Sequence, residues 1–124
     1  MGFSHETTVH HFTLTPTGGF ISAEVLSAAD TSTQTSIRHH MNHIAMAFAQ
    51  GDFEMPMFVH DTTPPGVETM KRLRAQIQYT EQATALGGRV VIKTANSEAV
   101  QAIHAFLRFQ IAEHRTNDSP NVIH

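Results

Sequence analysis

The chain has 124 residues, of which 40% are hydrophobic and 15% charged, and its formal net charge is -3 at pH 7 with neutral histidines. This length supports one domain with a single core, and the composition is typical of a globular protein. Basic residues are scattered and no apolar run reaches about 18 residues, so we expect neither a nucleic-acid partner nor a membrane span. Cysteine is absent, which excludes disulfides, thiolate metal sites and cysteine nucleophiles.

The first half of the chain predicts a hairpin followed by a long helix. Residues 8–17 alternate roughly between apolar and polar side chains, and residues 20–26 form a second β-rich run after the pair Gly18-Gly19. We therefore expect a turn at these glycines. Asp30 or Thr31 can cap a helix that runs to about Gln50, where a glycine follows as a stop signal.

The second half repeats this order after a proline-rich loop. Its predicted elements are a short helix at 67–76, strands at 77–84 and 89–94 around a Gly87-Gly88 turn, and a helix capped by Asn96 that ends near His114. Residues 119–124 form a polar tail outside the predicted domain, and we expect the polar stretch from Arg115 onward to be mobile.

The two halves share the order strand, Gly-Gly turn, strand, capped helix and aspartate. Ile37 and Ile103 each lie fifteen residues before an aspartate, at Asp52 and Asp118. We predict one α+β domain over residues 1–118, with an internal repeat of about 8–52 and 77–118. In this duplicated ββα fold, a four-stranded, mostly antiparallel sheet carries two long helices on one face and a short connecting helix. A cavity would lie between the helices and the sheet.

The main compositional bias is the presence of ten histidines. At about 100° per residue, His40 lies at the apolar stripe of the first long helix, whereas His39, His43 and the neighbouring Met46 point away from it. In the last helix, His104 and His114 border the apolar stripe. His10 and His11 point to opposite faces of the first strand, so one of them faces inward. His60 lies in the proline-rich loop.

Two interpretations of the inward histidines compete. A single histidine on an apolar face is usually a packed group bonded to a carbonyl or carboxylate. Several imidazoles that converge from different elements would share few protein acceptors, and a metal ion would satisfy them together. The candidate ligands for copper or zinc are His10 or His11, together with His40, His60 and His104, and with His114 as a further candidate.

Haem is the alternative cofactor, because it needs only one or two axial histidines and an apolar slot. His40 and His104, on facing helices, would supply an axial pair. The predicted slot is lined by Phe48, Phe58, Leu107 and Ile111. The run Met55, Met57 and His60 would suit copper, although methionines also commonly fill gaps in a core.

Four segments together resemble a family of small, often exported bacterial proteins that are frequently mislabelled "aspartate carbamoyltransferase". The segments are T-T-V-H-H-F from Thr7, I-R-H-H-M-N-H-I-A from Ile37, V-H-D-T-T-P-P-G-V from Val59 and A-I-H-A-F-L-R-F-Q-I-A-E-H from Ala102. The positions that match the family pattern are His10, His40, His60, His104 and His114. The resemblance implies export to the periplasm, although this chain shows no signal peptide. True transcarbamoylases are more than twice as long, and their Ser-Thr-Arg-Thr run is missing here.

We therefore predict a small metal- or haem-binding protein with a histidine-lined pocket. One alternative is a pH-responsive, ligand-binding or dimerisation module without metal, in which a homodimer would form through the exposed sheet face or edge. The other is a histidine-dependent metalloenzyme, with His60 and Asp61, or His104 and His114, in acid–base roles. The sequence contains no nucleophile elbow, phosphate loop or H-E-x-x-H helix, so we expect binding rather than catalysis.

Overall fold

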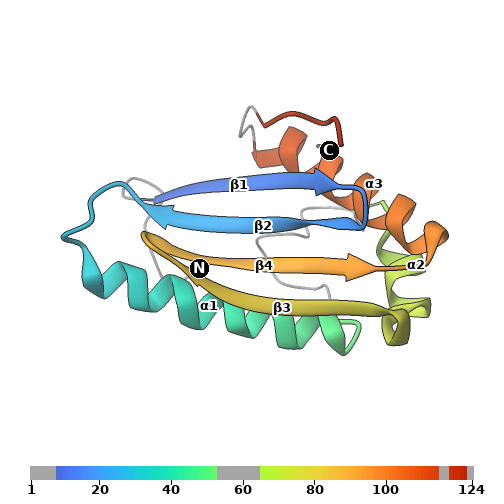
Figure 1. The fold of residues 1–124 in the computed structure, drawn as a ribbon, viewed down its shortest axis with the longest axis horizontal. Helices are drawn as coiled ribbons and strands as arrows, with labels where there is room; N and C mark the ends of the chain where they lie inside the picture. Colours follow the sequence, from blue (N-terminus) through green and yellow to red (C-terminus); the bar gives the residue numbers. More distant parts are fainter. Residues whose placement is uncertain (1–7, 53–64, 115–117, 123–124) are drawn as a thin grey trace.

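The computed structural model describes residues 8–52, 65–114 and 118–122, without the side chains of Glu113 and His114. Its elements are β1 (Thr8–Thr15), β2 (Gly18–Val25), α1 (Thr31–Ala49), α2 (Val67–Arg72), a 3-10 turn (Arg74–Gln76), β3 (Ile77–Thr84), β4 (Gly87–Thr94) and α3 (Ser97–His114). The four strands form an antiparallel sheet in the order β1-β2-β4-β3 (Figure 1). The predicted α+β class and duplicated ββα order are confirmed.

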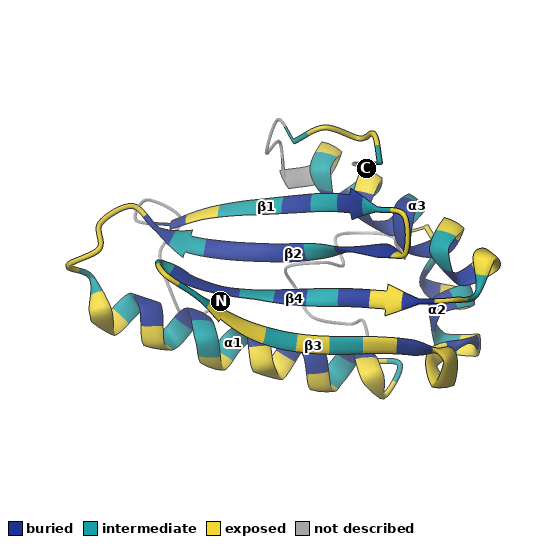
Figure 2. Ribbon diagram, in the orientation of Figure 1, coloured by how far each residue is buried: buried dark blue, intermediate teal, exposed yellow. Residues whose placement is uncertain are grey.

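Each long helix packs mainly on the hairpin of the other half. α1, which follows β2, lies chiefly against β3 and β4, whereas α3, which follows β4, lies chiefly against β1 and β2 (Figure 1). The cores of the two repeats are therefore interlocked. Figure 2 shows the resulting alternation of buried and more exposed positions along the strands, which is the pattern of a sheet with one covered face.

The predicted Gly-Gly turns were wrong by two residues in both hairpins. The turns are at Pro16-Thr17 and Ala85-Leu86, and the glycine pairs are the first residues of β2 and β4. The reason is close packing. A Cβ on Gly19 would lie 2.4 Å from both Thr13 O and Leu107 Cδ1. The glycines thus let neighbouring backbone and α3 approach the sheet, instead of supplying a turn conformation.

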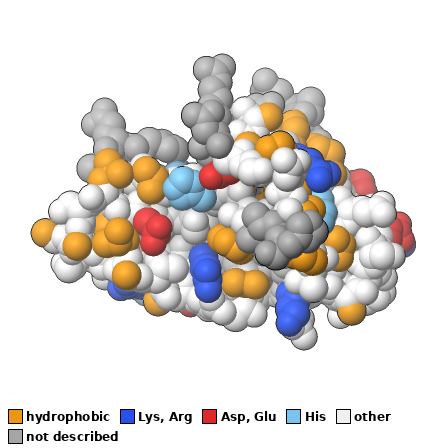
Figure 3. Space-filling view, turned by 45° about the horizontal axis from the view of Figure 1, so that its top comes forward, with side chains coloured by type: hydrophobic (Ala, Val, Ile, Leu, Met, Phe, Trp, Pro, Cys, Tyr) orange, Lys and Arg blue, Asp and Glu red, His pale blue; other side chains and the backbone are white. Residues whose placement is uncertain are grey.

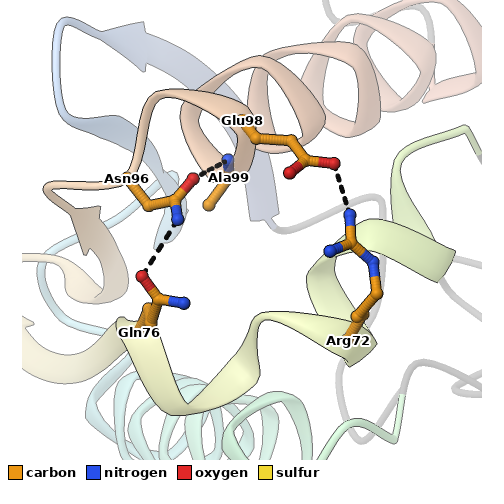
Figure 4. Close-up of polar contacts among 5 residues, drawn as sticks. All are labelled: Arg72, Gln76, Asn96, Glu98 and Ala99. Atoms are coloured by element: carbon orange, nitrogen blue, oxygen red, sulfur yellow. Dashed lines mark hydrogen bonds and ion pairs between the residues drawn. The ribbon is translucent and has the colours of Figure 1, made fainter.

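The helix starts follow their capping residues. The Asp30 side chain accepts a hydrogen bond from the Thr33 N–H, which settles the cap of α1 on Asp30. Asn96 Oδ1 accepts from the Ala99 N–H at 3.0 Å, as predicted, and Asn96 Nδ2 donates to Gln76 Oε1 (Figure 4).

The connecting helix is shorter than predicted. α2 ends at Arg72, and a separate 3-10 turn follows Leu73, so the expected single helix over 67–76 is divided. An ion pair between Arg72 and Glu98 joins α2 to the start of α3 (Figure 4). The division lets the chain turn into β3 while the Asn96–Gln76 contact holds the 3-10 turn against α3.

Asp118 and the described part of the C-terminal tail that follows it contact the sheet. Asp118 Oδ2 accepts from the Phe12 N–H at 2.9 Å, and Asp118 Oδ1 lies 2.9 Å from His11 Nδ1. Val122 then forms a parallel bridge with Leu14. The tail therefore covers the outer edge of β1, which would otherwise present unpaired backbone groups.

Candidate functional site

His10 projects from β1 toward the helix-covered side of the sheet. It shares that face with Phe12 and Leu14, which are fully buried, and its Nε2 atom is shielded from solvent. Across the sheet, His10 pairs with Ala23, and Ala23 pairs in turn with Gly88 on β4. The next two positions in this row of the sheet therefore carry the smallest side chains.

His40 approaches the same region from α1. On that helix, Arg38 donates from Nε to Gly87 O and from Nη2 to Thr84 O, each at 2.9 Å. The side of α1 that carries Arg38 therefore faces the β3–β4 turn. Two residues correspond to about 200° around a helix, which places His40 on the opposite flank, toward the middle of the sheet. Met41, next to His40, lies directly over Gly88. His40 thus follows α1 where this helix covers Gly88, which belongs to the same row of the sheet as His10.

The imidazole of His40 is biased toward its neutral form. Burial is the main cause of its lowered pKa, and the nearby imidazole of His43 lowers the pKa further. The Nε2 atom of His40 is also shielded from solvent. Neutral imidazole is the form that binds metal ions, so a lowered pKa reduces competition from protons.

We expect the metal-free protein to lose stability as the pH falls through the ordinary histidine pKa of 6.5. The pKa of His40 in the folded state is lower than in the unfolded chain, so the unfolded state binds a proton first as the pH falls. Neutral His40 therefore contributes to stability above the ordinary histidine pKa, and this contribution is lost progressively below it. Urea unfolding in the presence of a chelator, at pH values from about 7.5 to about 5, measures the effect. His40→Gln should flatten part of the decline, and an unchanged pH dependence in that variant would contradict the assignment.

His104 has a structural partner at the other end of β1. Its Nε2 lies 2.7 Å from Thr15 O, and because a carbonyl only accepts, this nitrogen carries the proton. Thr15 is five residues after His10, a distance of about 16 Å along a strand. The structure therefore does not bring His104 together with His10.

Arg38 is the counterpart of His104 in the first repeat. Each residue lies eight positions after its helix cap, and each reaches the carbonyl of the residue before a two-residue turn, Thr84 for Arg38 and Thr15 for His104. The two side chains thus fasten each helix to the hairpin of the other half. Arg38 was not predicted as a contact residue, because nothing in its local sequence pattern indicates a hydrogen bond to a distant turn.

The remaining predicted site residues fall into two groups. His60 and Phe58 lie outside the described residues, as does the side chain of His114. Phe48 and Leu107 are fully buried members of the hydrophobic core, and Ile111 packs against that core while partly buried. Phe48 makes edge-to-face contacts with Tyr79 and Phe106, so its ring contributes to core packing.

Tyr79 is a buried polar residue that was not among the predicted site residues. Its hydroxyl is shielded from solvent and has no hydrogen-bond partner among the residues that the structure describes. Burial raises its pKa, which keeps the phenol protonated. Tyr79 faces Ile92 across the sheet, four positions along β4 from Gly88, or about 13 Å. It therefore lies apart from the region between His10 and His40.

The surface histidines do not gather into one patch. His39 and His43 are exposed, as predicted from the helical periodicity, and His11 contacts Asp118 at the edge of β1. In the view of Figure 3, histidines appear at separate places and the basic side chains are dispersed. Within the described ranges, the structure contains no group of three or more His, Asp or Glu side chains placed to hold a metal ion.

Comparison with known proteins gives no match to a family model, to a curated protein or to a solved structure. The resemblance to exported bacterial proteins therefore stays a prediction. Among the described helices, none is long and apolar enough to span a membrane.

Proposed function

We propose that the protein binds a transition-metal ion, zinc or copper, through His10 and His40 on the covered face of the sheet. The observation that carries this proposal is the placement of two imidazoles from different elements, each with a shielded Nε2, beside a row of the sheet reduced to Ala23 and Gly88. Imidazole suits both metals, and the lowered pKa of His40 favours its ligating form.

Two imidazoles do not complete a zinc or copper site, which takes three or four ligands. His60 and His114 are the predicted sources of the others, and their side chains lie outside the described residues. His104 is left out of the proposed set because Thr15 O holds its Nε2. A bare ion is favoured over haem, since the proposed axial pair included His104 and two predicted walls of the slot, Phe48 and Leu107, are fully buried in the core.

Metal analysis of untagged protein, purified without chelators or a nickel column, tests the proposal. We expect about one equivalent of zinc or copper, with affinity reduced about tenfold or more in His10→Ala and in His40→Ala, as measured by competition with a chelator. His104→Gln is the matched control, because it removes an inward histidine from the same side of the sheet. It should retain the metal. Metal-free protein that binds neither ion on addition would refute the proposal, as would a loss of binding in His104→Gln alone.

A further inference from the structure

A turn at the end of α1 folds Asp52 back beside the helix. Gly51 has a φ of +82°, its N–H donates to Phe48 O, and the Asp52 N–H donates to Ala47 O, both at 2.9 Å. This pair of bonds is the Schellman motif, in which a left-handed glycine reverses the chain after a helix. The motif places Asp52, which follows the helix in sequence, beside Ala47, one turn after His43.

Asp52 consequently shares a surface hollow of about 200 Å³ with His43, Met46, Ala47 and Gln50. Three of these residues carry donor atoms of different kinds, namely an imidazole nitrogen, a thioether sulfur and a carboxylate oxygen. His43 and Met46 are three residues apart and so are neighbours on the helix surface. The hollow therefore presents a mixed nitrogen, sulfur and oxygen donor set.

The position of Met46 is unusual for its type. It is 58% exposed, one of three large hydrophobic side chains that face solvent among the described residues. Asn42 Nδ2 lies 3.7 Å from its sulfur, which holds the thioether on the outer side of the helix. A thioether sulfur has a second lone pair, which remains for a ligand.

We propose that this hollow binds a copper ion through His43, Met46 and Asp52. Imidazole accepts most first-row transition ions, but a thioether selects copper, above all Cu(I), over zinc. The carboxylate is a harder oxygen ligand, which suits Cu(II) better than Cu(I). This site differs from the proposed His10–His40 site, because its donors lie on the exposed surface of α1 and on the turn that follows it.

The competing explanation is a surface histidine pair, since His39 and His43 are four residues apart on one helix. The structure separates them, because His39 lines a different hollow, beside β3, together with Arg38 and Glu81. His39→Ala is therefore a matched control for His43→Ala. Both variants remove one exposed histidine from the same helix, and only the second removes a proposed ligand.

Amide NMR with substoichiometric Cu²⁺ locates the ion, because paramagnetic copper broadens nearby signals. We expect broadening first at Ala47, Gln50 and Asp52. Broadening confined to Ala23 and Gly88 would instead mark the other proposed site and would overturn the inference. Zn²⁺ serves as the comparison ion in the affinity measurements, because it should gain little from the thioether of Met46.

Chelator competition then assigns the ligands. We expect the copper affinity to fall about tenfold or more in His43→Ala and in Asp52→Asn, and Cu⁺ affinity to fall in Met46→Leu, with His39→Ala unchanged. Equal losses in His39→Ala and His43→Ala, with no effect of Met46→Leu or Asp52→Asn, would show an adventitious histidine pair. That result would overturn the proposal, and so would an absence of copper binding at micromolar concentrations.

Discussion

Phe106→Ala is expected to lower the free energy of unfolding by about 3–5 kcal/mol, the usual cost of removing a large aromatic side chain from a core. Phe106 on α3 is fully buried, and its ring meets that of Phe48 on α1 edge to face, with centroids 5.9 Å apart. Phe48 in turn contacts Tyr79 on β3 at 5.7 Å. This aromatic series joins both helices to the sheet. Urea unfolding followed by far-UV circular dichroism measures the loss.

Phe109→Ala is the matched control, since Phe109 lies three residues further along the same helix and is only partly buried. It should cost clearly less than Phe106→Ala. A double-mutant cycle with Phe48→Ala should give a coupling of about 0.5–1.5 kcal/mol for the ring pair. Equal losses in the two single variants would contradict the central role of Phe106, and zero coupling would show that the two rings stabilise the fold independently.

The interlocked packing explains which features of the fold the sequence could predict. Strand alternation, helix periodicity and the caps at Asp30 and Asn96 are local signals, and the elements that depend on them are confirmed. The sheet order and the packing of each helix on the other hairpin depend on contacts between distant residues. The repeat indicated two similar halves, but similarity alone does not tell which helix covers which hairpin.

The candidate site likewise has features that local sequence patterns predict and features that depend on contacts between distant residues. Periodicity placed His40 on the inner side of α1 and His39 and His43 outside, because the direction of a side chain follows from its position in a helix. The position of His104 along the sheet depends on how α3 docks, and its hydrogen bond to Thr15 O spans 89 residues of sequence. Convergence of several histidines is therefore a tertiary property that no local pattern predicts.

The glycine pairs show how a correct signal received the wrong interpretation. Adjacent glycines commonly mark turns, and both pairs do lie within two residues of one. Their role in this fold is to allow close approach, and among the four glycines only Gly18 has a φ in the positive range, at +147°. The distinction follows from the surroundings of each Cα, which become defined only once β2, β4 and the helices are assembled.

Gly87→Ala is expected to destabilise the protein by about 3 kcal/mol or more, at or beyond the upper end of the usual cost of overpacking. A Cβ at this position would lie 2.2 Å from Ala23 O and 3.0 Å from Glu24 Cα, and both are backbone atoms of β2. The strands could accommodate it only by separating where β2 and β4 join the two repeats. Thermal or urea unfolding of the variant measures the cost.

Gly88→Ala is the control, because the added Cβ would chiefly meet Met41 Cγ at 3.3 Å, an atom of a flexible side chain. Methionine adapts readily, and alanine reduces the entropy of the unfolded chain, so we expect a change within about 1 kcal/mol of zero. The two neighbouring glycines therefore differ in what an added methyl group would meet, which is backbone at Gly87 and chiefly a flexible side chain at Gly88. If Gly88→Ala proved as damaging as Gly87→Ala, the contact of α1 with the sheet near His40 would be tighter than the strand contact. The space that we assign to a metal between His10 and His40 would then be too small.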